Sequence, residues 1–283
     1  MFNGDLKKEA IENLNKSAES YKDLVKVVQS KSAELFVFRK KSSEEVIGAV
    51  ESYINTLANT PKEFDRSFAE YKAEFRTFTQ MLSDLQTESD DIDFQFGTTA
   101  TAGIFAGVGT AAFAPTAAMA IATTFGTAGT GTAIASLSGA AATNAALAWL
   151  GGGTLAAGAG GMAGGNALLA LAGPVGWAIG GAAIVGGGFL ARSKNEKIAH
   201  EANANRKEVE VLIAQLKAAK GEVNSLIYLT KTHVTGVKEM LFKLQNYAFH
   251  DCRSFTPEAK NELVALINHI QSLSELLNKK VVV

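Results

Sequence analysis

The sequence predicts an all-α protein, in which long antiparallel helices form bundled or coiled-coil arms on either side of a helical head rich in glycine and alanine. Apolar residues recur at alternating steps of three and four towards both ends of the chain, which is the period of packed helices. No segment combines strand-like alternation with the turn chemistry of a hairpin. Between these ends, residues 94–191 contain no charged side chain and no histidine. We therefore divide the chain into an N-terminal arm (1–93), an apolar block (94–191) and a C-terminal arm (192–283).

A heptad seam predicts the first helix, from residue 5 onward. Its apolar positions are Ile11, Leu14, Ala18, Tyr21, Val25, Val28 and Leu35, and a second run continues with Val46, Val50, Tyr53 and Leu57. The polar residues 39–42 between the two runs leave open whether this is one long helix or two stacked ones. A continuous helix of about 55 residues would be ~80 Å long, as in a coiled-coil stalk.

The next helix is predicted to begin at Thr60-Pro61-Lys62-Glu63. Thr60 can cap it, Pro61 suits the first helical position, and Glu63 can complete a capping box. Its seam is rich in aromatic residues and is typical of packed core: Phe64, Phe68, Tyr71, Phe75, Phe78, Leu82 and Leu85. An acidic collar follows at the mouth of the apolar block: Glu88, Asp90, Asp91 and Asp93.

The C-terminal arm begins with a basic collar, Arg192, Lys194 and Lys197, and continues as a third long helix. The seam of that helix is Ile198, Ala202, Val209, Leu212, Leu216, Ala219, Val223 and Ile227, with an extension through Val234, Val237, Leu241 and Leu244. Thr256-Pro257-Glu258 predicts the start of a last amphipathic helix. The N-terminal arm has 18 acidic and 13 basic residues and the C-terminal arm 10 and 14, so the arms attract one another.

The apolar block has the composition that a lipid bilayer requires, since about 20 apolar residues make one helical span. Glycine and proline breaks divide it into about four pieces, and Trp149 and Trp177 lie near the ends of pieces, as interfacial tryptophans do. Small residues four apart let helices approach closely in lipid. The pairs are Gly103 and Gly107, Gly160 and Gly164, Gly161 and Gly165, and Gly176 and Gly180. Its threonine and serine hydroxyls either line water in an oligomer or bond back to their own helices.

The two collars constrain the topology of the block. An even number of spans would leave both arms on one side of the membrane, where the collars can pair. An odd number would keep the basic collar cytoplasmic and carry the acidic collar across. As a further hypothesis, protonation of the acidic collar would ease insertion.

Other classes of protein lack support in the sequence. The nearly balanced charge argues against a nucleic-acid partner. His200, His233, His250 and His269 have no metal-site spacing, and we assign all four to exposed polar helix positions. Cys252, close to His250, is interpreted as a spare thiol in a loop between helices. We predict no catalytic residue, cofactor or metal. The first eight residues have no apolar core, which predicts cytoplasmic synthesis without a signal peptide and membrane association in the active form.

Four runs of the block carry a resemblance to known proteins: ATTFGTA (122–128), GAAATNA (139–145), AWLGGG (148–153) and LAGPVGW (171–177). The pattern resembles bacterial proteins of unassigned function described as glycine-zipper or helical membrane proteins. In layout, the chain resembles α-pore-forming toxins of the cytolysin A and non-haemolytic enterotoxin type, and it is similar to apolipoprotein-L-like and colicin-like proteins. That layout implies an apolar head that is hidden in the soluble form and inserted in the membrane form. The block of this chain is longer than the single inserting segment, or tongue, of such toxins.

These observations lead to three hypotheses. The first is a membrane-inserting, pore-forming protein, a toxin or a defence effector. Its partners are a lipid bilayer and further copies of itself, with another helical protein as an additional candidate. The second is a membrane-anchored coiled-coil scaffold without pore activity. The third is a protein that buries the block as an ordinary core.

Overall fold

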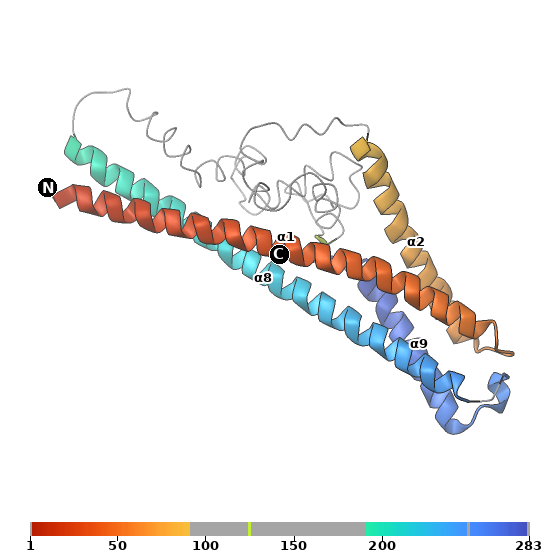
Figure 1. Ribbon diagram of the computed structural model, residues 1–283. Coiled ribbons are helices and arrows are strands. Elements are labelled where there is room, and N and C mark those ends of the chain that lie inside the picture. Colours follow the sequence, from red (N-terminus) through yellow and green to blue (C-terminus); the bar gives the residue numbers. More distant parts are fainter. Residues whose placement is uncertain (1, 91–123, 126–190, 248–249, 282–283) are drawn as a thin grey trace.

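The computed structural model describes residues 2–90, 124–125, 191–247 and 250–281 (Figure 1). Within these ranges the elements are α1 (Phe2–Ile54), α2 (Lys62–Asp90), α8 (Ala191–Gln245), the short 3-10 helix η2 (Cys252–Ser254) and α9 (Pro257–Leu277). The only extended pairing in the described ranges consists of two isolated bridges. The all-α prediction is therefore confirmed.

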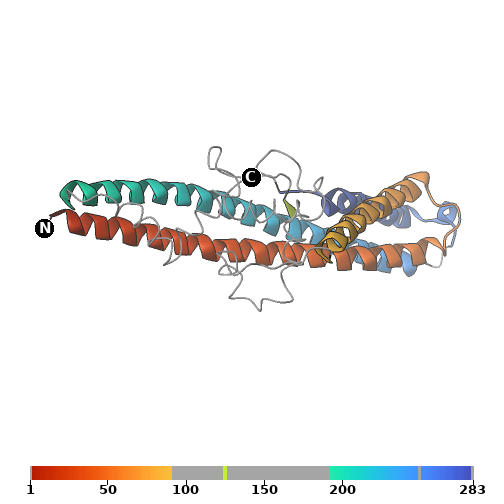
Figure 2. The ribbon, with the colours of Figure 1, turned by 90° about the horizontal axis from the view of Figure 1, so that it is seen from above.

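The two longest helices, α1 and α8, lie side by side and run in the same direction (Figures 1 and 2). The chain reverses after α1 to form α2, and it reverses after α8 to form α9, so each pair of consecutive helices within an arm is antiparallel. The N-terminal and C-terminal arms therefore meet chiefly through a parallel pair. The ion pair between Lys238 Nζ and Glu45 Oε2, 2.8 Å long, joins the same two helices.

α1 is one unbroken helix of 53 residues, which answers the question that residues 39–42 left open. At 1.5 Å per residue, it is about 80 Å long. The seam continues through the polar tetrad because Arg39 and Ser42 are themselves buried, whereas Lys40 and Lys41 are exposed. Steps of three and four are thus kept, although the residue types change.

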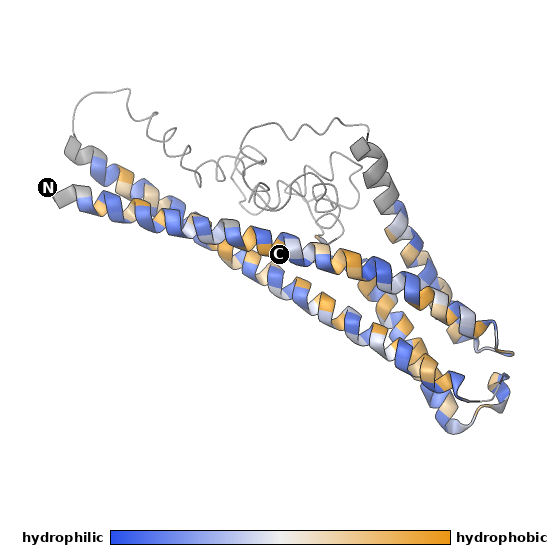
Figure 3. Ribbon diagram, viewed as in Figure 1, coloured by the Kyte–Doolittle hydropathy of each residue, from blue (hydrophilic) through white to orange (hydrophobic). Residues whose placement is uncertain are grey.

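The apolar side chains form two clusters along the α1–α8 pair, and Figure 3 shows their recurrence between polar residues on all four long helices. We call the first the stalk cluster; its helical members come chiefly from the first parts of α1 and α8 and include Leu14, Tyr21, Val25, Val28, Leu35, Leu212, Leu216, Ala219, Val223 and Leu226. We call the second the base cluster; it draws on all four helices and includes Val46, Val50, Phe64, Phe68, Tyr71, Phe78, Val237, Leu241, Leu263, Leu266 and Ile270.

The aromatic seam of α2 is core, as predicted, wherever its side chains are described. Phe64, Phe68, Tyr71 and Phe78 are buried, and Phe75 is half-buried against the base cluster. The rings of Phe75 and Phe78 are stacked with centroids 6.5 Å apart. This spacing lies within the range in which aromatic pairs stabilise a core beyond the area they bury.

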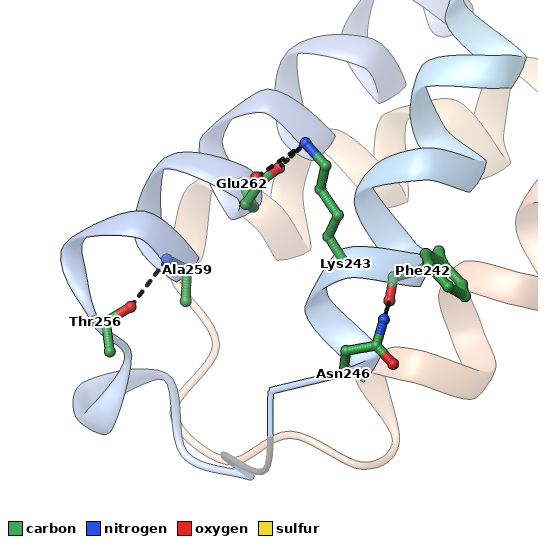
Figure 4. A network of polar contacts seen from close by, with 6 residues as sticks. All are labelled: Phe242, Lys243, Asn246, Thr256, Ala259 and Glu262. Carbon is green, nitrogen blue, oxygen red and sulfur yellow. Dashed lines mark hydrogen bonds and ion pairs between the residues drawn. The ribbon is translucent and has the colours of Figure 1, made fainter.

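The start of α9 follows the predicted cap. The Thr256 hydroxyl accepts a hydrogen bond from the Ala259 amide at 3.3 Å, and Pro257 occupies the first turn (Figure 4). Nearby, Lys243 of α8 pairs with Glu262 of α9 at 3.1 Å (Figure 4). The start of α2 differs from the prediction, because the helix begins at Lys62 and the Thr60 hydroxyl donates to the carboxylate of Asp65 at 3.0 Å instead of accepting from an amide of the first turn.

The turn after α1 meets the turn after α8. The Ala58 amide donates to the His250 carbonyl at 2.6 Å, and the Cys252 amide donates to the Ala58 carbonyl at 3.0 Å. Asn59 has a positive φ of 56° and donates from its side chain to Asp251. Asn tolerates this left-handed conformation better than most residues do. The two helical hairpins are thereby joined at their closed ends.

Candidate functional site

A layer of buried polar side chains lies between the two apolar clusters. We call it the polar belt; it consists of Ser32, Arg39, Ser42, Ser43 and Thr230. Three of its hydroxyls donate to carbonyls of their own helices: Ser32 to Val28 at 2.8 Å, Ser42 to Phe38 at 2.6 Å and Thr230 to Leu226 at 2.7 Å. The Ser43 hydroxyl accepts from the Tyr71 hydroxyl at 2.9 Å. These bonds offset the cost of burying polar groups.

Arg39 is the charged member of the polar belt and is only 1% exposed. Its Nη2 donates to the carbonyls of Leu276 at 2.6 Å and Lys279 at 3.0 Å, at the C-terminal end of α9. The last carbonyls of a helix have no intrahelical partner and carry the negative end of its dipole. Burial lowers the pKa of Arg39 to about 10, which still leaves the guanidinium charged at neutral pH. Arg39 therefore anchors the end of α9 to the second half of α1.

Residues 278–281, which we call the C-terminal tail, continue from this anchor. The Asn278 side chain donates to the Glu74 carboxylate at 2.6 Å and to the Glu74 carbonyl at 3.0 Å, which ties the tail to α2. Burial and the positive charge of Arg39 lower the pKa of Lys280 to about 8. Val281 is buried in the stalk cluster. The tail thus contacts α1, α2 and the stalk cluster within four residues.

Apart from Ala191, the structure describes only Thr124 and Phe125 of the apolar block, and the C-terminal tail contacts both. The Val281 amide donates to the Thr124 carbonyl at 2.7 Å, and Phe125 forms an isolated bridge with Val281. Phe125 is 0% exposed and belongs to the stalk cluster. Figures 1 and 2 show this short segment close to the middle of α1. At this point the block is docked on the helical arms.

Most of the residues predicted to act in the membrane lie outside the described ranges. They are Gly103, Gly107, Trp149, Gly160, Gly161, Gly164, Gly165, Gly176, Trp177 and Gly180, together with Asp91 and Asp93 of the acidic collar. Glu88 and Asp90 belong to the end of α2, whereas Arg192, Lys194 and Lys197 belong to the beginning of α8. α8 begins near the start of α1, and α2 ends much farther along α1 (Figures 1 and 2). These parts of the two collars therefore do not meet in this structure.

Two histidines that the sequence places on exposed positions are instead paired at the α8–α9 interface. His233 and His269 are half-buried, and their Nδ1 atoms lie 3.0 Å apart. The assignment of these two residues to exposed positions is wrong. His233 directly precedes the buried seam residue Val234, and His269 directly precedes Ile270. This position beside the seam is the sequence signal that could have placed both histidines at the interface. His200 is exposed on α8, as expected, whereas His250 is exposed but lies in the turn between α8 and η2.

Cys252 lies in η2, between α8 and α9, and its side chain is buried. Burial, with smaller contributions from the negative charges of Asp251 and Asp65, raises the pKa of its thiol. A reactive cysteine needs the opposite, an electropositive and accessible site that favours the thiolate. These surroundings agree with a spare thiol in an interhelical turn.

Comparison with protein-family models, with curated proteins and with solved structures finds no match for this chain. Within the described ranges, none of the helices combines the length and the apolar composition that a membrane span needs. The same ranges contain no cluster of three or more His, Cys, Asp or Glu residues arranged to bind a metal ion.

Proposed function

We propose that this protein inserts its apolar block into a lipid bilayer and forms a pore there, with the helical arms holding the block before insertion. The observation that carries the proposal is the charge-free run 94–191, placed between two arms whose apolar seams are buried against one another. Because α1, α2, α8 and α9 supply most of the members of both clusters, the arms do not need a hundred further apolar residues as core.

The docking of Phe125 supports a form in which the block is held back. Burying a phenylalanine side chain is worth about 1.5–3 kcal/mol. Residues 98–125 contain six Ile, Val, Leu or Phe residues, which together favour insertion at the centre of a span by roughly 2–4 kcal/mol. The two quantities are similar, since this part of the block is rich in Gly, Ala and Thr rather than Leu. Docking of Phe125 can therefore compete with insertion of residues 98–125.

Insertion would follow in three steps. The block leaves the arms, its apolar pieces enter the bilayer as paired helices, and several copies associate through the faces that carry Gly160, Gly161, Gly164 and Gly165. Small residues at such faces let helix backbones pack closely where lipid removes the hydrophobic force between helices. The arms, with their charged outer surfaces, stay in water.

The test is dye release from liposomes by protein purified without detergent, together with flotation of the same liposomes. We expect release with co-flotation. The variants Gly161→Leu and Gly165→Leu should weaken release without weakening flotation. Gly221→Leu is the matched control, because this position of α8 is exposed and a Cβ added there meets no other atom within 4 Å. Protein that neither floats nor releases dye would refute the proposal.

The anchored scaffold is the second candidate, and one feature of α8 favours it. Tyr228 and Phe242 are each 68% exposed, and they lie two heptads apart on one helix. Large aromatic residues are enriched where proteins bind each other. Flotation without dye release, and a need for detergent during purification, would support this alternative over pore formation.

A further inference from the structure

The contact between His233 and His269 is a hydrogen bond between two titratable rings on different helices. Their Nδ1 atoms are 3.0 Å apart, and the rings meet edge to face with centroids 5.2 Å apart. Gly236 of α8 makes the approach possible, because a Cβ at that position would overlap the His269 ring. The imidazole of α9 therefore rests directly on the backbone of α8.

The number of protons on this pair decides whether the bond exists. A bond between two Nδ1 atoms needs one N–H donor and one lone-pair acceptor. Two neutral rings provide both, as different tautomers. One added proton keeps the bond, because the imidazolium still donates from Nδ1 to the neutral ring. A second proton removes the last acceptor and brings two positive charges into contact. The α8–α9 contact thus tolerates one added proton but not two.

The surroundings disfavour protonation of His269. Burial, and to a lesser extent the charge of His233, lower the pKa of His269, and Glu239 opposes them with a smaller effect. His233 and Glu239 both belong to α8, and the other elements packed here contribute no described charged group that acts on His269. Two charged residues of α8, Lys238 and Lys243, form ion pairs with Glu45 and Glu262 on other helices.

A metal ion fits the pair less well than a proton does. A structural zinc site needs four ligands and a catalytic one needs three. In the part of the chain that the structure describes, no group of three His, Cys, Asp or Glu side chains converges here or elsewhere. The two ring nitrogens also already satisfy each other.

We propose that the His233–His269 pair makes the attachment of α9 to α8 sensitive to protons, so that α9 loosens as the pH falls from neutral to mildly acid. The sign follows from linkage. A histidine whose folded-state pKa lies below the unfolded value of about 6.5 binds fewer protons when folded, so stability decreases as the pH falls through that window. α9 ends at the Arg39 anchor and continues into the tail that holds Phe125. Release of the apolar block by acid is a consequence that rests on the proposed function.

The test measures unfolding of the full chain by urea between pH 7.5 and pH 5.0, without lipid. The folding equilibrium constant falls by at most about tenfold per pH unit for each extra proton that the unfolded chain binds. We expect His269→Gln to lose less stability over this range than the wild type, and the exposed control His200→Gln to follow the wild type. Equal pH dependence of His269→Gln and the wild type would overturn the proposal.

A second measurement needs no variant and so does not depend on its folding. NMR titration of the imidazole signals of the wild type should show that His269 takes up its proton at a lower pH than an exposed imidazole does, because burial lowers its pKa. Proton uptake by His269 at the same pH as an exposed imidazole would overturn the proposal. Since neither experiment contains a membrane, a failure of pore formation would leave both results unchanged, and the two proposals can fail separately.

Discussion

The stalk and the base of this protein are built on the same two long helices, yet they bury their apolar side chains in different ways. In the base, α2 and α9 cover α1 and α8, and the core contains clustered aromatic rings such as Phe36 and Phe78, with centroids 5.8 Å apart. In the stalk, α1 and α8 pack chiefly against each other through aliphatic residues. Figure 2 shows the two-helix part extending away from the four-helix part.

This difference indicates which part of the protein is more stable and which part opens more easily. The side chains at the centre of both clusters are almost completely buried. In the base, however, helices enclose such a side chain on more sides, so its removal leaves a void that the surroundings cannot easily fill. Regions with fewer buried contacts open at lower free energies. The polar belt lies at the boundary, and there the tail and Phe125 are attached. The attachment of the block thus sits at the edge of the weaker region.

The prediction with the largest expected effect tests whether side chains of the base are more completely enclosed than those of the stalk. Phe64→Ala in the base should lower the free energy of unfolding by about 3–5 kcal/mol, because it empties a site enclosed by packed helices. Leu216→Ala in the stalk should lower it by about 2–3 kcal/mol, since water can reach a gap in a two-helix seam. Urea unfolding measures both. Equal losses would show that the stalk is enclosed as completely as the base.

The second prediction concerns the boundary itself. Arg39→Met should lower the free energy of unfolding by about 1–3 kcal/mol, because the carbonyls of Leu276 and Lys279 lose a charged donor while the side chain leaves an unfavourable burial. Arg39→Lys should not restore the loss, since one ammonium cannot reproduce the geometry of the guanidinium fork.

Hydrogen exchange locates the effect of this change. The Val281 amide, bonded to Thr124, should exchange faster in Arg39→Met, while the amides in the middle of α2 keep their protection. Arg76→Met, at an exposed position of α2, is the matched control and should change neither stability nor the exchange of Val281. Unchanged exchange at Val281 would show that Arg39 does not hold the tail.

The sequence predicted the helices and their buried seams because these depend on local periodicity. Most seam residues of the base, such as Val50, Tyr71 and Leu266, are buried as expected. The expected antiparallel arrangement holds within each arm but not between α1 and α8, because opposite net charges attract in either direction. The burial of Arg39 was also missed, since its partners are carbonyls more than 230 residues away and carry no sequence signature.

The candidate site was less predictable for a similar reason. The glycines and tryptophans chosen from the block lie outside the described residues, so their roles stay predictions. The docking of Phe125 is accompanied by a backbone hydrogen bond between the neighbouring Thr124 and Val281, which periodicity cannot reveal. The histidine pair joins residues 36 positions apart, and only the register of α9 against α8 brings them together. Contacts of this kind are set by tertiary packing.

The prediction with the smallest expected effect compares the stalk and the base through two glycines of α8. Gly221 lies in the stalk part, where an added Cβ meets no atom within 4 Å, whereas a Cβ at Gly236 in the base would overlap the His269 ring. Glycine inside a helix is roughly 0.5–1 kcal/mol less favourable than alanine. Gly221→Ala should therefore raise the free energy of unfolding by about that amount. Gly236→Ala should lose this gain, because the His269 ring must move away from its partner. Urea unfolding of both variants at pH 7.5 measures the difference, and a similar gain for both would mean that α9 approaches α8 less closely than the ring position indicates.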